Sequence, residues 1–165
     1  MIKLFFKLAV AILLIPAFTH ATEHNHESHV EAKLIELLVY KTPTCGCCKK
    51  WITHIEDEGV IAHSKDYRNI SNIKTKYGIK PNYRSCHTAV TRNGFAFEGP
   101  VPAKFIKQFL AEKHNNAIGL SVPAMPVGSP GMEVGERFMP YNVLILFKDG
   151  TSEVYAEVKT YEEQF

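Results

Sequence analysis

Hydrophobic and polar positions follow strand-like and helix-like patterns in turn along the first half of the chain. An almost continuous apolar run, LIELLVY, is typical of a strand buried on both faces. Cys48, Ile52 and Ile55 then recur at the spacing of one helical face. The pattern predicts a strand at 34–40, a helix from an N-cap at Thr44 to a stop at Gly59, a strand at 61–67 and a short helix between Asn69 and Gly78.

Turn residues divide the second half. Asn93-Gly94 and Asp149-Gly150 each lie between two β-prone runs, so each predicts a β-hairpin. Residues 114–140 are rich in Pro and Gly and are expected to form a structured loop rather than helix or strand. The hairpin strands are expected at 83–90 with 91–98 and at 143–147 with 152–158, and a helix opened by Pro102 should present Phe105, Ile106, Phe109 and Leu110 on one face.

The order of these elements predicts an α/β fold. A strand, a helix and a second strand in succession form a βαβ unit, whose two strands pair in parallel. We therefore expect a single thioredoxin-like domain (β-α-β-α-β-β-α) over residues 34–158, with an extra C-terminal loop and β-hairpin. Residues 159–165 are expected to form a short tail.

The first 21 residues have the features of a secretory signal peptide. Lys3 and Lys7 precede an apolar run at 8–17, and Thr19-His20-Ala21 resembles a cleavage site. The run is shorter than the roughly 20 residues that a membrane span needs, so an uncleaved anchor is the less favoured alternative. We expect export, cleavage after Ala21, a periplasmic location and no stable membrane insertion afterwards.

Composition and charge exclude some function classes. Hydrophobic residues make up 45% and charged residues 22%, as in ordinary globular proteins. The net charge of +2 comes from the two lysines of the predicted signal peptide, and no basic stripe suggests nucleic-acid binding. The polar tail at 22–33 contains three histidines that either recruit metal ions or belong to a solvated spacer, namely His24, His26 and His29.

Three of the four cysteines lie at the predicted start of the first helix. The helix dipole and the neighbouring Lys49 and Lys50 favour thiolates there. Cys45 and Cys48 have the C-x-x-C spacing of thiol–disulfide oxidoreductases. Cys47 would compete for the wrong disulfide in such an enzyme, so three adjacent thiolates are better explained as ligands for a soft metal ion.

Cys86 is predicted to complete this site. In a thioredoxin-like topology, the loop before the third strand returns to the start of the first helix. Zinc accepts four sulfurs, but its structural sites usually combine two separate C-x₂₋₄-C pairs, whereas these ligands are arranged as three plus one. Thiolates also select Cu(I), and several bridged Cu(I) ions would reduce the negative charge of the sulfurs. We therefore expect a small copper–thiolate centre, with zinc as the less favoured ion.

Three further residues are candidate ligands. Met125 and Met132 lie in the Pro- and Gly-rich loop, and their thioethers either bind Cu(I) or fill gaps in the core. His87 follows Cys86 and either binds metal, forms a hydrogen bond or points away from the site.

Four motifs in this order resemble those of the CopG-like family of periplasmic copper-resistance proteins. They are CGCC at 45–48, SCHT at 85–88, EGPVP at 98–102 and VPAMPVGSPGM at 122–132. The resemblance covers about residues 34–158 and implies a thioredoxin-like fold with a Cu(I) site on Cys45, Cys47, Cys48 and Cys86. Family members often have His where this chain has Pro100, so a ligand at that position is lost.

The expected function is to sequester or transfer Cu(I) in copper resistance, without catalytic turnover, with a copper efflux or carrier protein as a further partner. The alternative is a thiol–disulfide oxidoreductase that uses Cys45 and Cys48. A third interpretation, two purely structural disulfides, is disfavoured because adjacent Cys47 and Cys48 make the geometry awkward.

Overall fold

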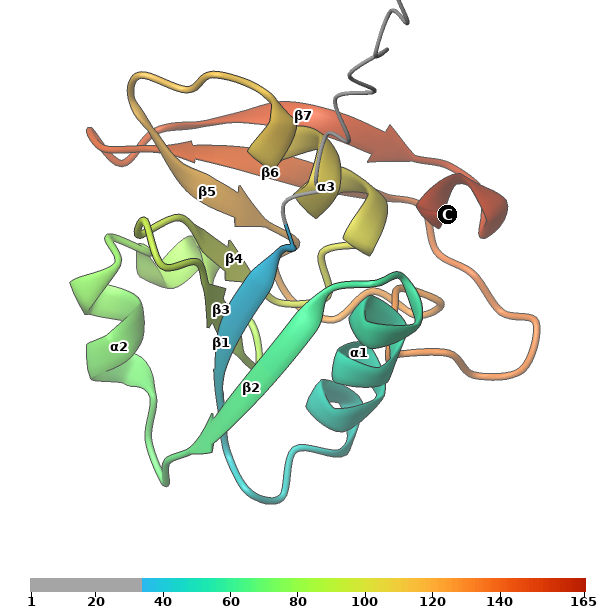
Figure 1. Ribbon diagram of the computed structural model, residues 1–165. Coiled ribbons are helices and arrows are strands. Elements are labelled where there is room, and N and C mark those ends of the chain that lie inside the picture. Colours follow the sequence, from blue (N-terminus) through green and yellow to red (C-terminus); the bar gives the residue numbers. More distant parts are fainter. Residues whose placement is uncertain (1–33) are drawn as a thin grey trace, which may run out of the picture. The chain divides into compact units, whose positions relative to one another are not determined.

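A computed structural model of the chain describes residues 34–165, which form a mixed α/β fold on one seven-stranded sheet (Figure 1). The predicted signal peptide and the histidine-containing tail lie outside the described residues. The strands are β1 (Glu36–Lys41), β2 (Ile61–Asp66), β3 (Thr88–Val90), β4 (Ala96–Glu98), β5 (Ala117–Ser121), β6 (Tyr141–Phe147) and β7 (Ser152–Val158). The helices are α1 (Gly46–Asp57), α2 (Ser71–Lys76) and α3 (Ala103–Ala111), with short 3₁₀ turns η1 (Pro81–Tyr83) and η2 (Glu162–Gln164).

The strand order is β2-β1-β3-β4-β5-β6-β7. β1 pairs in parallel with β2 and antiparallel with β3, so the predicted βαβ unit is confirmed. Leu37 and Val39 of β1 join the main core with residues of α1 and α3, whereas Leu38 and Tyr40 pack in a second cluster with Ile79, just beyond α2. This burial on both faces explains the continuous apolar run of β1.

Helix α1 begins one residue later than predicted. Its N-cap is Cys45 rather than Thr44, because the Cys45 sulfur accepts a hydrogen bond from the Cys48 N–H at 3.3 Å. Gly59, with a φ of +79°, follows the helix end as predicted. Trp51 is fully buried and donates its indole N–H to the Val101 carbonyl at 2.8 Å, which fixes α1 against the segment before α3.

Both predicted hairpins are confirmed, as the β3–β4 and β6–β7 pairs. The strands of the first are much shorter than predicted, because β3 and β4 have three residues each and a 3₁₀ turn and a loop precede β3. The prediction for 114–140 is wrong at one place, because β5 lies inside it, parallel to β4 and antiparallel to β6. At Gly119, in the middle of β5, a Cβ atom would collide with the backbone of Ala96. The close pairing of β5 with β4 thus requires Gly119, and this same glycine contributes to the loop prediction for the segment. β5 attaches the C-terminal hairpin to the sheet.

The end of the chain packs against the long loop between β5 and β6. Gln164 is buried, accepts a hydrogen bond from the Tyr141 hydroxyl at 2.6 Å and donates one to the Gly128 carbonyl at 3.1 Å. These contacts hold the loop at its middle. None of the helices in residues 34–165 is long and apolar enough to cross a membrane.

Candidate metal centre

The four cysteine sulfurs converge, and all of them lie within 4.8 Å of one another. Cys45, Cys47 and Cys48 come from the first turn of α1 and the residue that caps it. Cys86 comes from the loop between η1 and β3, which passes beside this helix start as the topology predicts. The chain therefore brings together donor atoms that are 39 residues apart between Cys47 and Cys86.

Cys47 occupies the middle of the group. Cys45 and Cys48 form a disulfide with a Cα–Cα distance of 5.3 Å, and Cys47 and Cys86 are free thiols. The Cys47 sulfur lies 3.4 Å from that of Cys45 and 3.7 Å from that of Cys86. The four sulfurs are close enough for shared ligation, but the disulfide has to be reduced before all four can bind a metal ion.

Burial controls the protonation of Cys86. Removal from water raises the pKa of its thiol to about 12, and the adjacent Cys47 acts in the same direction. In the metal-free protein the Cys86 thiol therefore keeps its proton at neutral pH. A metal ion that binds this sulfur has to displace the proton, so its binding releases protons and tightens as the pH rises.

The loop between β5 and β6 brings one methionine to the cysteines. The Met125 thioether sulfur lies 4.0 Å from the Cys47 sulfur, while the side chain remains 45% exposed. Met132 is partly buried on the same loop. Among residues 34–165, the methionine sulfur in contact with a cysteine sulfur is that of Met125 and not that of Met132. The two methionines were equal candidates from the sequence, but the structure places only Met125 beside the cysteines.

The same loop docks on the first turn of α1 through Gly131. This residue has a φ of +85°, and a Cβ atom there would lie 2.5 Å from the Cys47 carbonyl oxygen and 2.9 Å from the Trp51 nitrogen. A side chain at this position would push the loop away from the helix. Gly131 therefore permits the approach that places the loop between β5 and β6 (residues 122–140, the methionine loop) over the cysteines.

His87 lies behind Cys86, inside the protein. Its Nδ1 is 3.3 Å from the Cys86 sulfur, and its ring packs on Trp51 with 4.2 Å between ring centroids. Burial, aided by the positive charge of Lys74, lowers the pKa of His87 to about 3, so the imidazole is neutral. Its Nε2 is buried and has no hydrogen-bond partner within residues 34–165. His87 thus contacts the sulfur cluster through Cys86 rather than pointing away.

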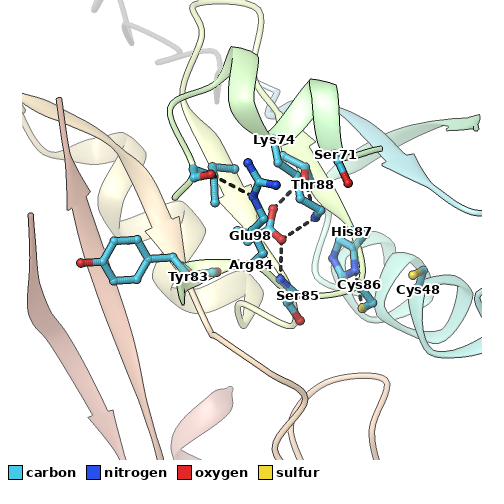
Figure 2. A network of polar contacts seen from close by, with 12 residues as sticks. Cys48, Ser71, Lys74, Tyr83, Arg84, Ser85, Cys86, His87, Thr88 and Glu98 are labelled. Carbon is cyan, nitrogen blue, oxygen red and sulfur yellow. Dashed lines mark hydrogen bonds and ion pairs between the residues drawn. The ribbon is translucent and has the colours of Figure 1, made fainter. Parts of the chain in front are cut away.

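A buried ion pair supports the Cys86 loop (Figure 2). The Glu98 carboxylate accepts hydrogen bonds from the Lys74 ammonium at 2.5 Å, the Thr88 hydroxyl at 2.7 Å and the Ser85 N–H at 2.6 Å. Glu98 is fully buried and Lys74 is 4% exposed. Sequence reasoning missed both residues as parts of the site, although Glu98 belongs to the EGPVP motif.

Two solved structures resemble the chain over nearly their whole length. They are titled copper resistance protein copG, form 1 and form 2, and both are 37% identical to the chain. The match covers 76% of this chain and 98% of form 1 with a TM-score of 0.71, and 77% of this chain and all of form 2 with a TM-score of 0.72. The chain belongs to the CopG family.

A second comparison agrees with the CopG assignment but says less about function. Residues 83–132 match a family model described as a protein of unknown function, DUF411. This range includes Cys86, His87 and both candidate methionines, but it excludes the three cysteines of α1. A comparison with curated proteins finds no match. The predicted resemblance to the CopG-like family is thus confirmed by the solved structures.

Pro100 belongs to the EGPVP motif, which carries part of the resemblance to the CopG-like family. Pro100 is buried beside Gly99, and its side chain offers no donor atom; the loss of a ligand at this position stays a prediction. The three histidines of the N-terminal tail fall outside the described residues. The candidate centre of this CopG protein therefore consists of four cysteines, with Met125 at its exposed side and His87 at its buried side.

Proposed function

We propose that this CopG family member binds copper as Cu(I) through Cys45, Cys47, Cys48 and Cys86. The observation that carries the proposal is the convergence of the four sulfurs within 4.8 Å. The titles of the two similar structures, which name copper resistance, support copper over zinc. Thiolates are soft ligands that bind Cu(I) tightly.

The charge of the site favours more than one ion. Four thiolates around a single Cu(I) would carry a net charge of −3 in a site whose sulfurs are half-buried or buried. Several Cu(I) ions that share bridging sulfurs would reduce this charge. Met125 would add a neutral thioether donor from the exposed side. Met132, on the same loop, and His87, whose Nδ1 lies 3.3 Å from the Cys86 sulfur, remain candidate ligands.

Reduction of the Cys45–Cys48 disulfide would precede full copper binding. The disulfide takes two of the four thiolates away, so oxidation would weaken or release bound copper. The predicted signal peptide supports a periplasmic location, where thiols tend to form disulfides. In that compartment the protein would sequester copper or pass it to an efflux or carrier protein, with bound copper protecting the thiols from oxidation.

A thiol–disulfide oxidoreductase is the second candidate function. It is favoured by the disulfide between Cys45 and Cys48 at the start of α1, which follows the first strand of a βαβ unit as in a thioredoxin-like fold. The adjacent Cys47 thiol, 3.4 Å from the Cys45 sulfur, argues against it. Cys47 could attack the disulfide from within the molecule and compete with a substrate.

A Cu(I) titration tests the proposal. The reduced, mature protein is titrated against a chromogenic Cu(I) chelator, and the titration is repeated with Cys47→Ser and Cys86→Ser. We expect the wild type to take up more than one equivalent of Cu(I). Both variants should bind fewer ions or lose at least about tenfold in affinity, because removal of a ligand should cost no less than loss of an outer-shell partner.

Two controls separate the candidate functions. Met139→Leu changes an exposed methionine of the same loop and should leave copper uptake unchanged, whereas Met125→Leu should weaken it. Uptake no tighter than that of a simple thiol would refute the copper function. Disulfide reductase activity that survives in Cys47→Ser but is lost in Cys45→Ser would instead support the enzyme.

A further inference from the structure

Ser85 connects the two loops that carry the donors outside α1. It lies directly before Cys86, and its hydroxyl donates a hydrogen bond to the carbonyl of Ala124, the residue directly before Met125. Its backbone N–H donates to the Glu98 carboxylate at 2.6 Å. One residue therefore links the Cys86 loop, the methionine loop and the buried carboxylate.

The backbone at Ala124 needs such a link. Ala124 has a φ of +60° and is the one non-glycine residue with a positive φ in residues 34–165. An L-residue with a side chain is disfavoured in this conformation, so surrounding contacts have to hold it. The hydrogen bond from Ser85 engages the carbonyl of this residue, at the point where the chain turns to direct Met125 toward Cys47.

The position of Ser85 is itself restricted. At Gly99, which has a φ of +73°, a Cβ atom would lie 2.6 Å from both the Ser85 Cβ and the Val122 carbonyl oxygen. The backbone of Gly99 also donates to the His87 carbonyl at 3.0 Å, just beyond Cys86. Ser85 thus lies between the end of β4 and the start of the methionine loop, where Gly99 leaves room for it.

Glu98 holds Ser85 from the buried side (Figure 2). Its carboxylate is anchored by Lys74 and by Thr88, which is its register partner in the β3–β4 pair. A buried carboxylate with three donors is fixed in orientation, because loss of any of them would leave a charge poorly compensated away from water. The N–H of Ser85 therefore has a rigid acceptor.

We propose that Ser85, held by Glu98, is the positioning residue that keeps the Met125 thioether beside Cys47. This inference rests on the proposed copper function, because the thioether matters as a donor to Cu(I). Ser85 itself does not contact the metal. It acts through the Ala124 carbonyl, and the effect of removing its hydroxyl should depend on the presence of Met125.

A double-mutant cycle on Cu(I) affinity tests this dependence. The four proteins are the wild type, Ser85→Ala, Met125→Leu and the double variant, all reduced and titrated against the same chelator. We expect Ser85→Ala to lower the affinity about 2- to 10-fold, the range for loss of one hydrogen bond. In the Met125→Leu background, the same change should have less than about a twofold effect. Ser85→Thr, which keeps the hydroxyl, should restore the affinity.

A measurement without copper keeps the inference separate from the proposed function. The mature chain contains Met125, Met132 and Met139, so methyl-¹³C-methionine labelling gives three methyl signals. In the reduced, metal-free protein, Ser85→Ala should shift and narrow the Met125 signal because its side chain becomes more mobile. The Met139 signal should not change.

The outcomes are distinct. A wild type that binds no Cu(I) refutes the proposed function, and the methyl signals then still decide whether Ser85 positions Met125. An unchanged Met125 signal in Ser85→Ala overturns the inference, whatever the copper affinity. An equal loss of affinity with and without Met125 also overturns it, because Ser85 would then act through Cys86 or the fold alone.

Discussion

Substitution of Gly131 by alanine tests how the methionine loop is held against the cysteines. The added methyl group would lie 2.5 Å from the Cys47 carbonyl oxygen and 2.9 Å from the Trp51 nitrogen, both of them backbone atoms of α1 that cannot turn aside. Gly135 offers a matched control in the same loop. It also has a positive φ, +58°, but no atom lies within 4 Å of an added Cβ.

The two substitutions differ in one free-energy contribution. Each places alanine in a left-handed conformation, which costs about 1–2 kcal/mol, and each gains about 0.4–1 kcal/mol because the unfolded chain becomes less flexible. We therefore expect Gly135→Ala to lower the free energy of unfolding by about 1 kcal/mol. Gly131→Ala should lower it by about 3 kcal/mol, since overpacking adds about 1–3 kcal/mol.

Denaturation of the reduced, metal-free proteins by urea measures both changes, and a Cu(I) competition titration follows the site. Because Gly131→Ala can relieve its clash only by moving the loop off α1, it should also weaken Cu(I) binding, whereas Gly135→Ala should not. Equal losses of stability in the two variants, or unchanged Cu(I) affinity in Gly131→Ala, would refute the reasoning that this contact sets the position of the loop.

Two further predictions concern the packing around α1 and the C-terminus. Gln164→Ala should lower the free energy of unfolding, measured by urea denaturation, by about 2 kcal/mol, because it leaves the Tyr141 hydroxyl and the Gly128 carbonyl without their partner. A loss below about 0.5 kcal/mol would contradict this expectation. His54 accepts a hydrogen bond from the Ala103 N–H through Nε2, and burial lowers the pKa of His54. The charged groups that also act on the pKa of His54 are Glu58, Glu133, Asp57 and Lys107. Since His54 binds a proton more readily in the unfolded chain, the free energy of unfolding should fall as the pH drops below about 6.5. This fall should be smaller in His54→Gln, which keeps a hydrogen-bond acceptor. Identical pH profiles of the two proteins would contradict this role of His54.

The elements that could be predicted from the sequence are those with strong local signals. β1 and α1 follow from apolar spacing, and both hairpins follow from their Asx-Gly turns. β5 has no such signal, because Gly119 interrupts its short apolar run. Its strand conformation comes from pairing with β4 and β6 on both sides, which is tertiary information.

The sulfur cluster was predictable for a topological reason. A βαβ unit followed by an antiparallel strand brings the loop before that strand to the start of the first helix, so Cys86 was expected near Cys47, and the two sulfurs lie 3.7 Å apart. The support behind it was not predictable. Lys74 lies in a polar helix beside exposed residues, and its burial depends on Glu98, which is distant in the sequence.

The donors of the proposed copper site are held in two different ways, and this arrangement would suit the proposed transfer of Cu(I). Cys48 is fully buried in α1, and Cys86 is fixed from behind by His87 and by the loop that Glu98 anchors. Met125 is 45% exposed and belongs to a loop whose position depends on contacts with Ser85 and Gly131. A neutral thioether on the exposed side can be withdrawn without leaving an unpaired charge, whereas withdrawal of a buried thiolate would leave one. Exchange of Cu(I) with a partner protein is therefore expected from the methionine side, with the cysteines as the fixed part of the site.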